Sequence, residues 1–374
     1  MADIPTITVN EVSEPMYPAG SGGDNICVIA DAGFTKDVTK IYTFGNYNEA
    51  RGDHSSTDGI GPEPADWDDN VLLATIRDIF AEGAQTEPTH TLGIEKVYAI
   101  NVGDAPSNQD ISDAIDLAAT IPDCRIEVLP QVSDLTNMGA LKASLVALDG
   151  DGDFRLGIIV VSDVEDTISD MTDMTDTENT PAGVSSDRIL IESDPAKVGK
   201  LAAKIATTPY YIDPAYGAYR SLSATDLYNR SRLDLDTLVA GGVCCDWLNP
   251  DDVTKMEPCM CVSTAFRLLD GSRPVSSFVH ARRNADEQFR QIIQRAKSQL
   301  KRNNTLKARM LIEQNSISYL EEQKKAENIE DYLLDISVST ATPYGIIINA
   351  KVRPAAADYF ITFNGLVQTP TGGA

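Results

Sequence analysis

Four of the six cysteines lie close together and have the side chain that zinc prefers in structural sites. They form the pair Cys244-Cys245 and the group Cys259-Met260-Cys261. Structural zinc sites usually contain two cysteine pairs with two residues inside each pair, and the spacing here is different. The flanking residues are apolar, and a buried reduced cysteine behaves as a small hydrophobic side chain. The sequence therefore favours core cysteines over a metal site.

The segment Asp149-Gly150-Asp151-Gly152-Asp153 resembles the start of a calcium-binding loop. An EF-hand would continue with glycine at position 154 and glutamate at position 160. The chain has Phe154 and Val160 at these positions. We therefore expect a tight surface turn, and the sequence leaves open whether the Asp-rich loops bind cations.

The chain has three histidines, His54, His90 and His280, and none of them is part of a catalytic motif. His54 lies beside Asp53 and two serines, but the G-x-S-x-G turn of a serine hydrolase is missing. The glycine patterns of dinucleotide-binding and phosphate-binding loops are also missing after the predicted strands. We therefore predict no catalytic, cofactor-binding or metal-binding residues.

Alternating strands and helices predict an α/β layer domain between residues 41 and 161. Short apolar segments alternate here with amphipathic ones, and this order favours a mostly parallel sheet covered by helices. A buried strand is also expected earlier, at 26–30. The expected strands of the domain are 40–44, 96–102, 125–129 and 156–161, and the expected helices are 69–80, 110–120 and 138–148.

The second half of the chain contains further predicted elements after an acidic segment. Residues 162–186 are rich in acids and threonine, and they are expected to form an exposed loop. The expected fold class is α/β locally and α+β overall. The remaining expected strands are 189–191, 243–247, 332–339, 345–352 and 359–367, and the remaining expected helices are 195–206, 225–239, 278–300 and 305–326.

The overall charge restricts the classes of partner. The 374 residues carry a formal net charge of −25, which argues against direct binding of nucleic acids or anionic membranes. The length favours two or three domains. No apolar run approaches the roughly 18 residues of a membrane span, and the N-terminus does not have the pattern of a signal peptide. We therefore expect synthesis in the cytoplasm, no membrane insertion and reduced cysteines.

One predicted helix, 278–300, is basic within this acidic chain. Residues 273–325 contain 12 Lys+Arg against 5 Asp+Glu, so the rest of the chain carries 19 against 51. Asn284 is the expected N-cap of this helix. The pattern indicates either a solvated helix that covers a sheet or a cationic surface that meets an acidic partner. One face is apolar, with Ala285, Phe289, Ile292, Ile293, Ala296 and Leu300, and the other is basic, with Arg290, Arg295, Lys297, Lys301 and Arg302.

Both ends of the chain contain isolated strand patterns. Ile7, Val9 and Val12 alternate with polar residues before a cluster of proline, glycine and serine. The predicted strand 359–367 lies between Pro354 and a glycine-containing tail. An isolated strand must pair either with its own sheet or with a sheet edge of another chain.

The order of the segments resembles that of contractile tail sheath proteins, from myovirus-type tails and contractile injection systems, over nearly the whole chain. Two features depart from the family pattern: Thr264-Ala265-Phe266 lacks a Trp-Gly, and the opening lacks a Pro-Gly-Val. The segments that carry the resemblance are the extended opening 4–14, Tyr42-Thr43-Phe44-Gly45, the helix end 78–84, the strand 96–102, Ile126–Pro130, Thr208-Pro209-Tyr210-Tyr211, Leu238–Trp247, Arg282-Arg283 and Val352-Arg353-Pro354.

The resemblance implies an inner domain built from both chain ends and an inserted outer α/β domain. The inner domain would contain residues 25–40 and 207–354, and the outer domain residues 41–206. Residues 1–24 and 355–374 would be extended arms that add strands to neighbouring copies. The arm residues that would pair between subunits are Ile7, Val9, Val12, Tyr359, Ile361 and Phe363.

The resemblance also implies a function without catalysis. Subunits of this family stack as hexameric rings around a tail tube and contract to drive the tube through a target envelope. The implied partners are further copies of the chain, the tube protein, the baseplate and a tail terminator. The implied location is a virion tail or injection particle assembled in the host cytoplasm, and the basic face of helix 278–300 would then point at the tube. Two other classes stay open: a cytoplasmic α/β enzyme or ligand-binding protein with a degenerate site, and a secreted acidic surface protein.

Overall fold

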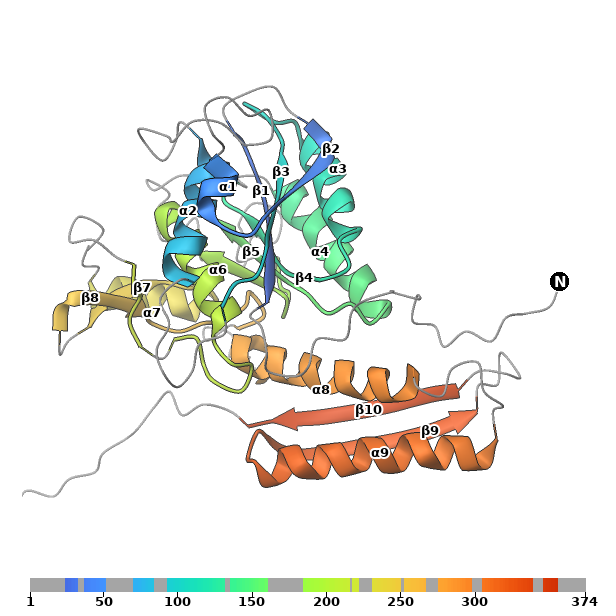
Figure 1. The fold of residues 1–374 in the computed structure, drawn as a ribbon. Coiled ribbons are helices and arrows are strands. Elements are labelled where there is room, and N and C mark those ends of the chain that lie inside the picture. Colours follow the sequence, from blue (N-terminus) through green and yellow to red (C-terminus); the bar gives the residue numbers. More distant parts are fainter. Residues whose placement is uncertain are drawn as a thin grey trace, which may run out of the picture.

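A computed structural model shows how these elements are arranged (Figure 1). The predicted arm strands, the residues Lys301 and Arg302, two of the histidines (His54 and His90) and most of the acidic segment 162–186 lie outside the residues that it describes. It describes residues 24–32, 37–51, 70–83, 93–131, 135–160, 184–215, 217–221, 231–249, 252–266, 275–297, 305–338 and 346–355.

A six-stranded sheet in the order β2-β3-β1-β4-β5-β6 forms the centre of the larger part of the molecule. β2 is antiparallel to its neighbour, and the other strands are parallel. The central strands are nearly continuous apolar runs because both of their faces are covered. The predicted mostly parallel sheet is therefore confirmed. The strands are β1 (Asn25–Ala30), β2 (Asp37–Phe44), β3 (Val97–Asn101), β4 (Cys124–Leu129), β5 (Leu156–Val160) and β6 (Ile189–Glu192).

Helices cover both faces of this sheet. α2 (Val71–Gly83) and α6 (Val198–Thr207) pack with Ile26 and Val28 of β1 on one face. α3 (Asn108–Ala119) and α4 (Leu135–Gly150) pack with Cys27 and Ile29 of the same strand on the other. This division follows from the alternation of side chains along a strand. Two short helical segments, α1 (Tyr47–Arg51) and η3 (Pro195–Lys197), complete this part.

A small hairpin continues from the β6 edge of the sheet. α7 (Arg232–Ala240) leads to Cys244, which forms a parallel bridge with Glu192. β7 (Asp246–Asn249) and β8 (Asp252–Pro258) then pair in an antiparallel hairpin. The sequence predicted the first of these strands but not β8, because its residues DVTKMEP lack a regular apolar alternation.

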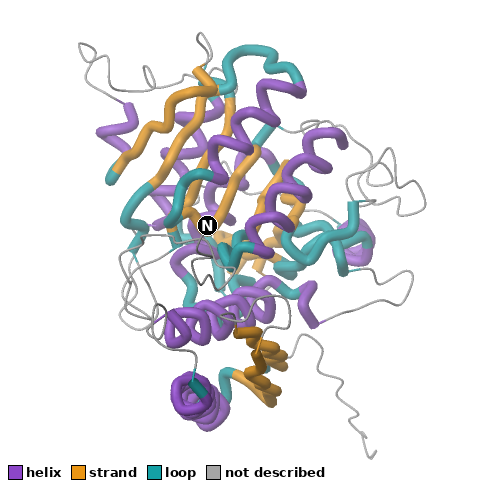
Figure 2. The backbone as a smooth tube through the Cα atoms, turned by 90° about the vertical axis from the view of Figure 1, so that its right-hand side faces the viewer, coloured by secondary structure: helices purple, strands orange, loops and turns teal. Residues whose placement is uncertain are grey.

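A second unit contains the C-terminal elements, and we call it the terminal unit. It consists of η5 (Val275–Ser277), α8 (Val279–Lys297), α9 (Leu306–Lys325), β9 (Ile329–Val338) and β10 (Ile346–Pro354). Both helices contact the β9–β10 hairpin and each other, and the group lies at the lower end of Figure 2, apart from the larger sheet. The predicted helices and strands of this region are confirmed.

Two predictions about these elements need correction. Residues 25–40 were grouped with the inner domain, but β1 is a central strand of the six-stranded sheet and β2 is its edge strand. The apolar run Ile26–Ala30 requires cover on both faces, and this sheet provides it. Asn284 lies within α8 and is not its N-cap, since the helix begins at Val279.

Among the described residues, no helix is both long and apolar enough to span a lipid bilayer.

Candidate assembly interface

Helix α8 lies across the amino ends of the parallel strands and joins the two units (Figure 1). Arg283 of α8 donates to Asp24, directly before β1, at 2.9 Å. Arg290 donates to the carbonyl of Phe154, just before β5, at 2.6 Å. Because parallel strands begin at the same edge of a sheet, these contacts place one side of α8 along that edge. We call this contact between α8 and the sheet edge the junction.

A buried group of charges forms the centre of the junction. Arg188, directly before β6, donates to both carboxylate oxygens of Asp286 of α8, at 2.9 and 3.1 Å. Arg188 also contacts Asp149 at the end of α4. Arg282 contacts Asp187 at 2.8 Å and Asp286 at 3.2 Å. Burial raises the pKa of Asp286 to about 6, although Arg188 and Arg290 act in the opposite direction.

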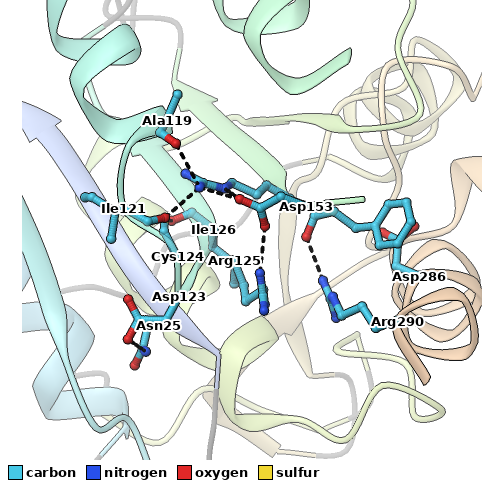
Figure 3. Close-up of polar contacts among 12 residues, drawn as sticks. Asn25, Ala119, Ile121, Asp123, Cys124, Arg125, Ile126, Asp153, Asp286 and Arg290 are labelled. Carbon is cyan, nitrogen blue, oxygen red and sulfur yellow. Dashed lines mark hydrogen bonds and ion pairs between the residues drawn. The ribbon is translucent and has the colours of Figure 1, made fainter. Parts of the chain in front are cut away.

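A second arginine cluster orders the loop before β5. Arg155 has a fully buried side chain, and it donates to Glu127 at 3.0 Å and to the carbonyl of Ile121 at 2.6 Å. Arg125 contacts Asp153 at 2.7 Å, and Figure 3 shows its guanidinium directed at that carboxylate. Burial raises the pKa of Glu127, and the charge of Arg155 lowers it.

The Asp-rich turn therefore binds arginines of the same chain. Asp149 contacts Arg188, and Asp153 contacts Arg125 and Arg155. The predicted tight turn is present, with Gly152 at φ +80°. Carboxylates that neutralise buried guanidinium groups are poor candidates for a calcium site, because cation binding would leave those charges unpaired.

The four clustered cysteines are divided between the two hydrophobic cores. Cys244 and Cys261 pack in the core that contains α2 and α6. Cys245 and Cys259 pack in the core that contains α3 and α4. Consecutive residues of extended chain point in opposite directions, so Cys244 and Cys245 diverge. No group of three or more metal-binding side chains occurs in the described part of the chain.

The carboxyl ends of parallel strands are the usual ligand-binding edge of such sheets. Here the side-chain oxygen of Asn101 accepts hydrogen bonds from the amides of Ala32 and Gly103. The side-chain oxygen of Gln131 accepts from the amide of Asp31. His280 lies away from this edge, buried in α8, with Nδ1 at 3.0 Å from Asp213. The side chains of Asn101 and Gln131 at this edge therefore accept hydrogen bonds from backbone amides of the same chain.

The structure gives partners within the chain to two of the five predicted tube-facing cations. Arg290 faces Phe154, as described above, and its guanidinium lies over the Phe154 ring. Arg295 donates to the carbonyl of Gln291 at 2.8 Å and lies 4.1 Å over the ring of Tyr319. Lys297 is partly exposed at the end of α8, and Lys301 and Arg302 are outside the described residues. Contact of this face with a tube stays a prediction.

The β9–β10 hairpin has two chemically different faces. Tyr332, Leu334 and Ile348 pack toward Ile292 of α8 and Leu320 of α9. The opposite face exposes 58% of Leu333 and 40% of Ile347. In the described residues the two strands pair only with each other, so each presents one edge without a strand neighbour. A two-stranded sheet is marginal by itself and gains stability from a helix or from further strands.

Both chain ends leave the described structure close to the terminal unit. The amide of Asp24 donates to the carbonyl of Ala206 at 3.1 Å, and its carboxylate contacts α8. The amide of Ala355 donates to the carbonyl of Asn328 at 3.2 Å, at the start of β9. The predicted arm residues themselves lie outside the described residues.

Sequence reasoning missed the acidic side of the junction, which consists of Asp24, Asp149, Asp187 and Asp286. Arg282 and Arg283 were noted only for their place in the order of segments. The expected N-cap at Asn284 would place Asp286 in the first turn of the helix, whereas the structure places it in the middle of α8 with a side chain that is 3% exposed. The sequence contained only a weak signal for the junction, which was the position of Arg188 directly before an apolar strand.

Comparisons with known proteins show the same fold in contractile sheath proteins. No protein-family model matches this sequence, and no curated protein is detectably similar to it. The anti-feeding prophage helical sheath in its contracted state matches with a TM-score of 0.65 and 12% identity, covering 98% of this chain and 100% of that one. A chain of the anti-feeding prophage baseplate matches with a TM-score of 0.64 and 12% identity, over 99% and 100% of the two chains.

A crystal structure of a sheath tail protein from Desulfitobacterium hafniense is also similar. Its TM-score is 0.62 at 10% identity, and the match covers 93% of this chain and 96% of that chain. The matches extend over the sheet, the junction and the terminal unit together, because each includes more than nine-tenths of both chains. The chain therefore has the fold of contractile sheath proteins.

Proposed function

We propose that the chain is a structural subunit of a contractile sheath, which polymerises as stacked hexameric rings around a tube and contracts to drive the tube forward. The observation that carries the proposal is the match to a helical sheath over 98% of this chain and 100% of the other. Absence of the usual loops for cofactors and phosphates supports a role without catalysis.

Strand addition between copies would hold such a lattice together. The described hairpin offers two strand edges next to the points where residues 1–23 and 356–374 leave the described structure. An arm from a neighbouring copy would add backbone hydrogen bonds there, with its apolar residues at alternate positions. Ile7 and Val9 have this spacing, as do Tyr359, Ile361 and Phe363, and Val12 follows Val9 three residues later. Such pairing tolerates rotation of the subunits while keeping them linked.

The end of α8 is the proposed contact with the tube. Lys297 lies at the last position of α8, and Lys301 and Arg302 follow it in a stretch without acids. An acidic tube would complement these charges and orient the subunit. Arg290 and Arg295 already have partners within the chain, so the proposed contact with the tube is restricted to Lys297, Lys301 and Arg302. Baseplate and terminator proteins would bind the ends of the sheath in the assembled virion tail or injection particle.

Electron microscopy of the purified protein tests the main proposal. Hollow striated cylinders are expected for the full chain, and compact particles are expected for variants that lack residues 1–23 or 356–374. The truncated variants should keep the described helices, because these lie between Tyr47 and Lys325. Compact particles of the full chain would favour a globular α/β binding protein or enzyme, and calcium-dependent sheets would favour a surface protein.

Charge reversal tests the contact with the tube separately. The variant Lys297→Glu with Lys301→Glu and Arg302→Glu should form cylinders but co-sediment poorly with the tube protein. Lys142→Glu, in α4 on the larger unit, is the matched control and should co-sediment normally. Equal co-sedimentation of both variants in moderate salt would remove the tube contact from the proposal and leave the sheath itself intact.

A further inference from the structure

The six cysteines form three close pairs of reduced thiols. Within each pair the two thiols are in contact, and this contact is the largest cause of the raised pKa of Cys27, Cys245 and Cys261. No disulfide links any of them. The pairs are Cys27 with Cys124, Cys244 with Cys261, and Cys245 with Cys259.

Cys245 and Cys259 lie directly opposite each other at the open end of the β7–β8 hairpin. Asp246 pairs with Pro258, so the register continues to these two residues. The amide of Cys259 donates to the carbonyl of Cys245 at 2.7 Å. Directly opposite residues have Cβ atoms about 4.5–5.5 Å apart, and a disulfide requires about 3.5–4.5 Å. If the two Cβ atoms moved about 1 Å closer together, the two sulfurs could therefore form a disulfide.

Exposure separates this pair from the other two. Cys259 is partly exposed, whereas the other five cysteines are buried. Thiol–disulfide exchange begins with attack by an accessible thiolate, so access selects Cys259 as the first residue to react. Cys245 is the thiol in position to react second. The Cys244–Cys261 and Cys27–Cys124 pairs have no exposed member.

We propose that Cys245 and Cys259 form an oxidation site, which closes to a disulfide when the protein meets a low-molecular-weight disulfide. The Cys259 thiolate attacks one sulfur of the reagent, forms a mixed disulfide and releases one small thiol. The Cys245 thiolate then attacks the Cys259 sulfur and releases the second small thiol. The two protein thiols are oxidised, the reagent is reduced to two thiols, and these carry the two protons.

The expected consequence is a hairpin that opens less often. The linked segment contains 15 residues, from Cys245 to Cys259, and closing a loop of this length should lower the open population by about 100-fold. The β7–β8 hairpin lies at the margin of the molecule in Figure 1. The site does not depend on the proposed sheath function, since it rests on the hairpin alone.

Peptide mapping of the full-length folded protein after incubation with oxidised glutathione tests the site. A peptide that joins Cys245 and Cys259 is expected, and the number of thiols titrated after denaturation should fall from the initial six to four. Cys245→Ser should accumulate glutathione on Cys259, because the resolving thiol is absent. Cys244→Ser is the matched control and should still form the link.

Three results would overturn the proposal. They are six remaining thiols in the wild-type protein, a stable glutathione adduct on wild-type Cys259 without an internal link, and a link between another pair. These readouts use the wild-type chain, so they remain decisive even if a serine variant fails to fold.

Discussion

Arg188 and Asp286 are 98 positions apart in the chain and form a two-point ion pair, with N–O distances of 2.9 and 3.1 Å. Their side chains are 2% and 3% exposed. Arg188 lies directly before β6 of the six-stranded sheet and Asp286 lies in the terminal unit, so the pair fixes the orientation of one unit on the other. Bidentate arginine–carboxylate pairs are geometrically specific, which suits this role.

Removal of one partner should therefore destabilise the fold. Arg188→Met leaves Asp286 buried without its main counter-charge, and the expected loss in the free energy of unfolding is about 3–5 kcal/mol. Urea denaturation followed by circular dichroism measures it. Arg353→Met is the control, since Arg353 contacts Glu330 at the surface with 72% and 49% exposure, and it should cost about 0–1 kcal/mol. Similar losses for both variants would contradict a structural role of the junction.

The raised pKa of Asp286 predicts a pH dependence of stability. Its folded value of about 6 is above the usual value of about 3.9 for aspartate. Between these values the folded state binds more protons than the unfolded state, so stability should fall as pH rises through this window, by at most about 3 kcal/mol. The charged groups facing the carboxylate are Arg188, Arg282 and Arg290, together with Asp149.

Asp286→Asn isolates this contribution. As pH rises from about 4 to about 6, the variant should lose less stability than the wild type, because asparagine does not titrate. Asp246, whose pKa burial also raises to about 6, keeps its own contribution in both proteins. Urea midpoints measured across this range provide the comparison, and parallel curves for the two proteins would show that Asp286 has no special role.

Gly199 of α6 lies at a close contact with α2 on one face of the sheet. A Cβ atom at this position would lie 2.7 Å from the carbonyl oxygen of Thr75 in α2. Gly199→Ala should therefore destabilise the protein by about 1–3 kcal/mol. Gly139→Ala in α4 is the matched control, since a Cβ there meets nothing within 4 Å, and it should stabilise by about 0.5–1 kcal/mol. Thermal unfolding should show opposite shifts of the two midpoints.

The elements that sequence reasoning located are those with a local signal. β5 (LGIIV) is a continuous apolar run because helices cover both of its faces. β8 contains Lys255 and Glu257 and was missed, since its pairing depends on β7 more than on its own pattern. The junction could not be predicted, because a charge such as Asp286 looks like a surface residue until its distant partner is known.

The adjacent cysteines Cys244 and Cys245 show that the sequence contained more information about a metal site than we used. Cys244 and Cys245 lie on a predicted strand, and alternation alone directs their side chains to opposite faces. A zinc site that uses both was therefore excluded by the strand prediction itself. The contact of Cys245 with Cys259, in contrast, required the β7–β8 register.

The exposed face of the β9–β10 hairpin predicts that a substitution there can impair assembly without impairing folding. Leu333 is 58% exposed, so Leu333→Gln should change the free energy of unfolding of the isolated chain by about 0.5 kcal/mol or less. The proposed sheath would cover this face or the adjoining strand edge with a neighbouring copy, so cylinder formation should weaken. Sedimentation of assembled material, compared with denaturation of the soluble subunit, separates the two effects.

Leu334 is the matched control because it is the next residue along β9 and faces inward. Its side chain packs against the cluster of Ile292 and Leu320, so Leu334→Gln should destabilise the subunit by about 2 kcal/mol or more. Assembly would then fail together with folding. Normal cylinders from Leu333→Gln would show that this face stays exposed in the lattice and would confine the subunit contacts to the strand edges.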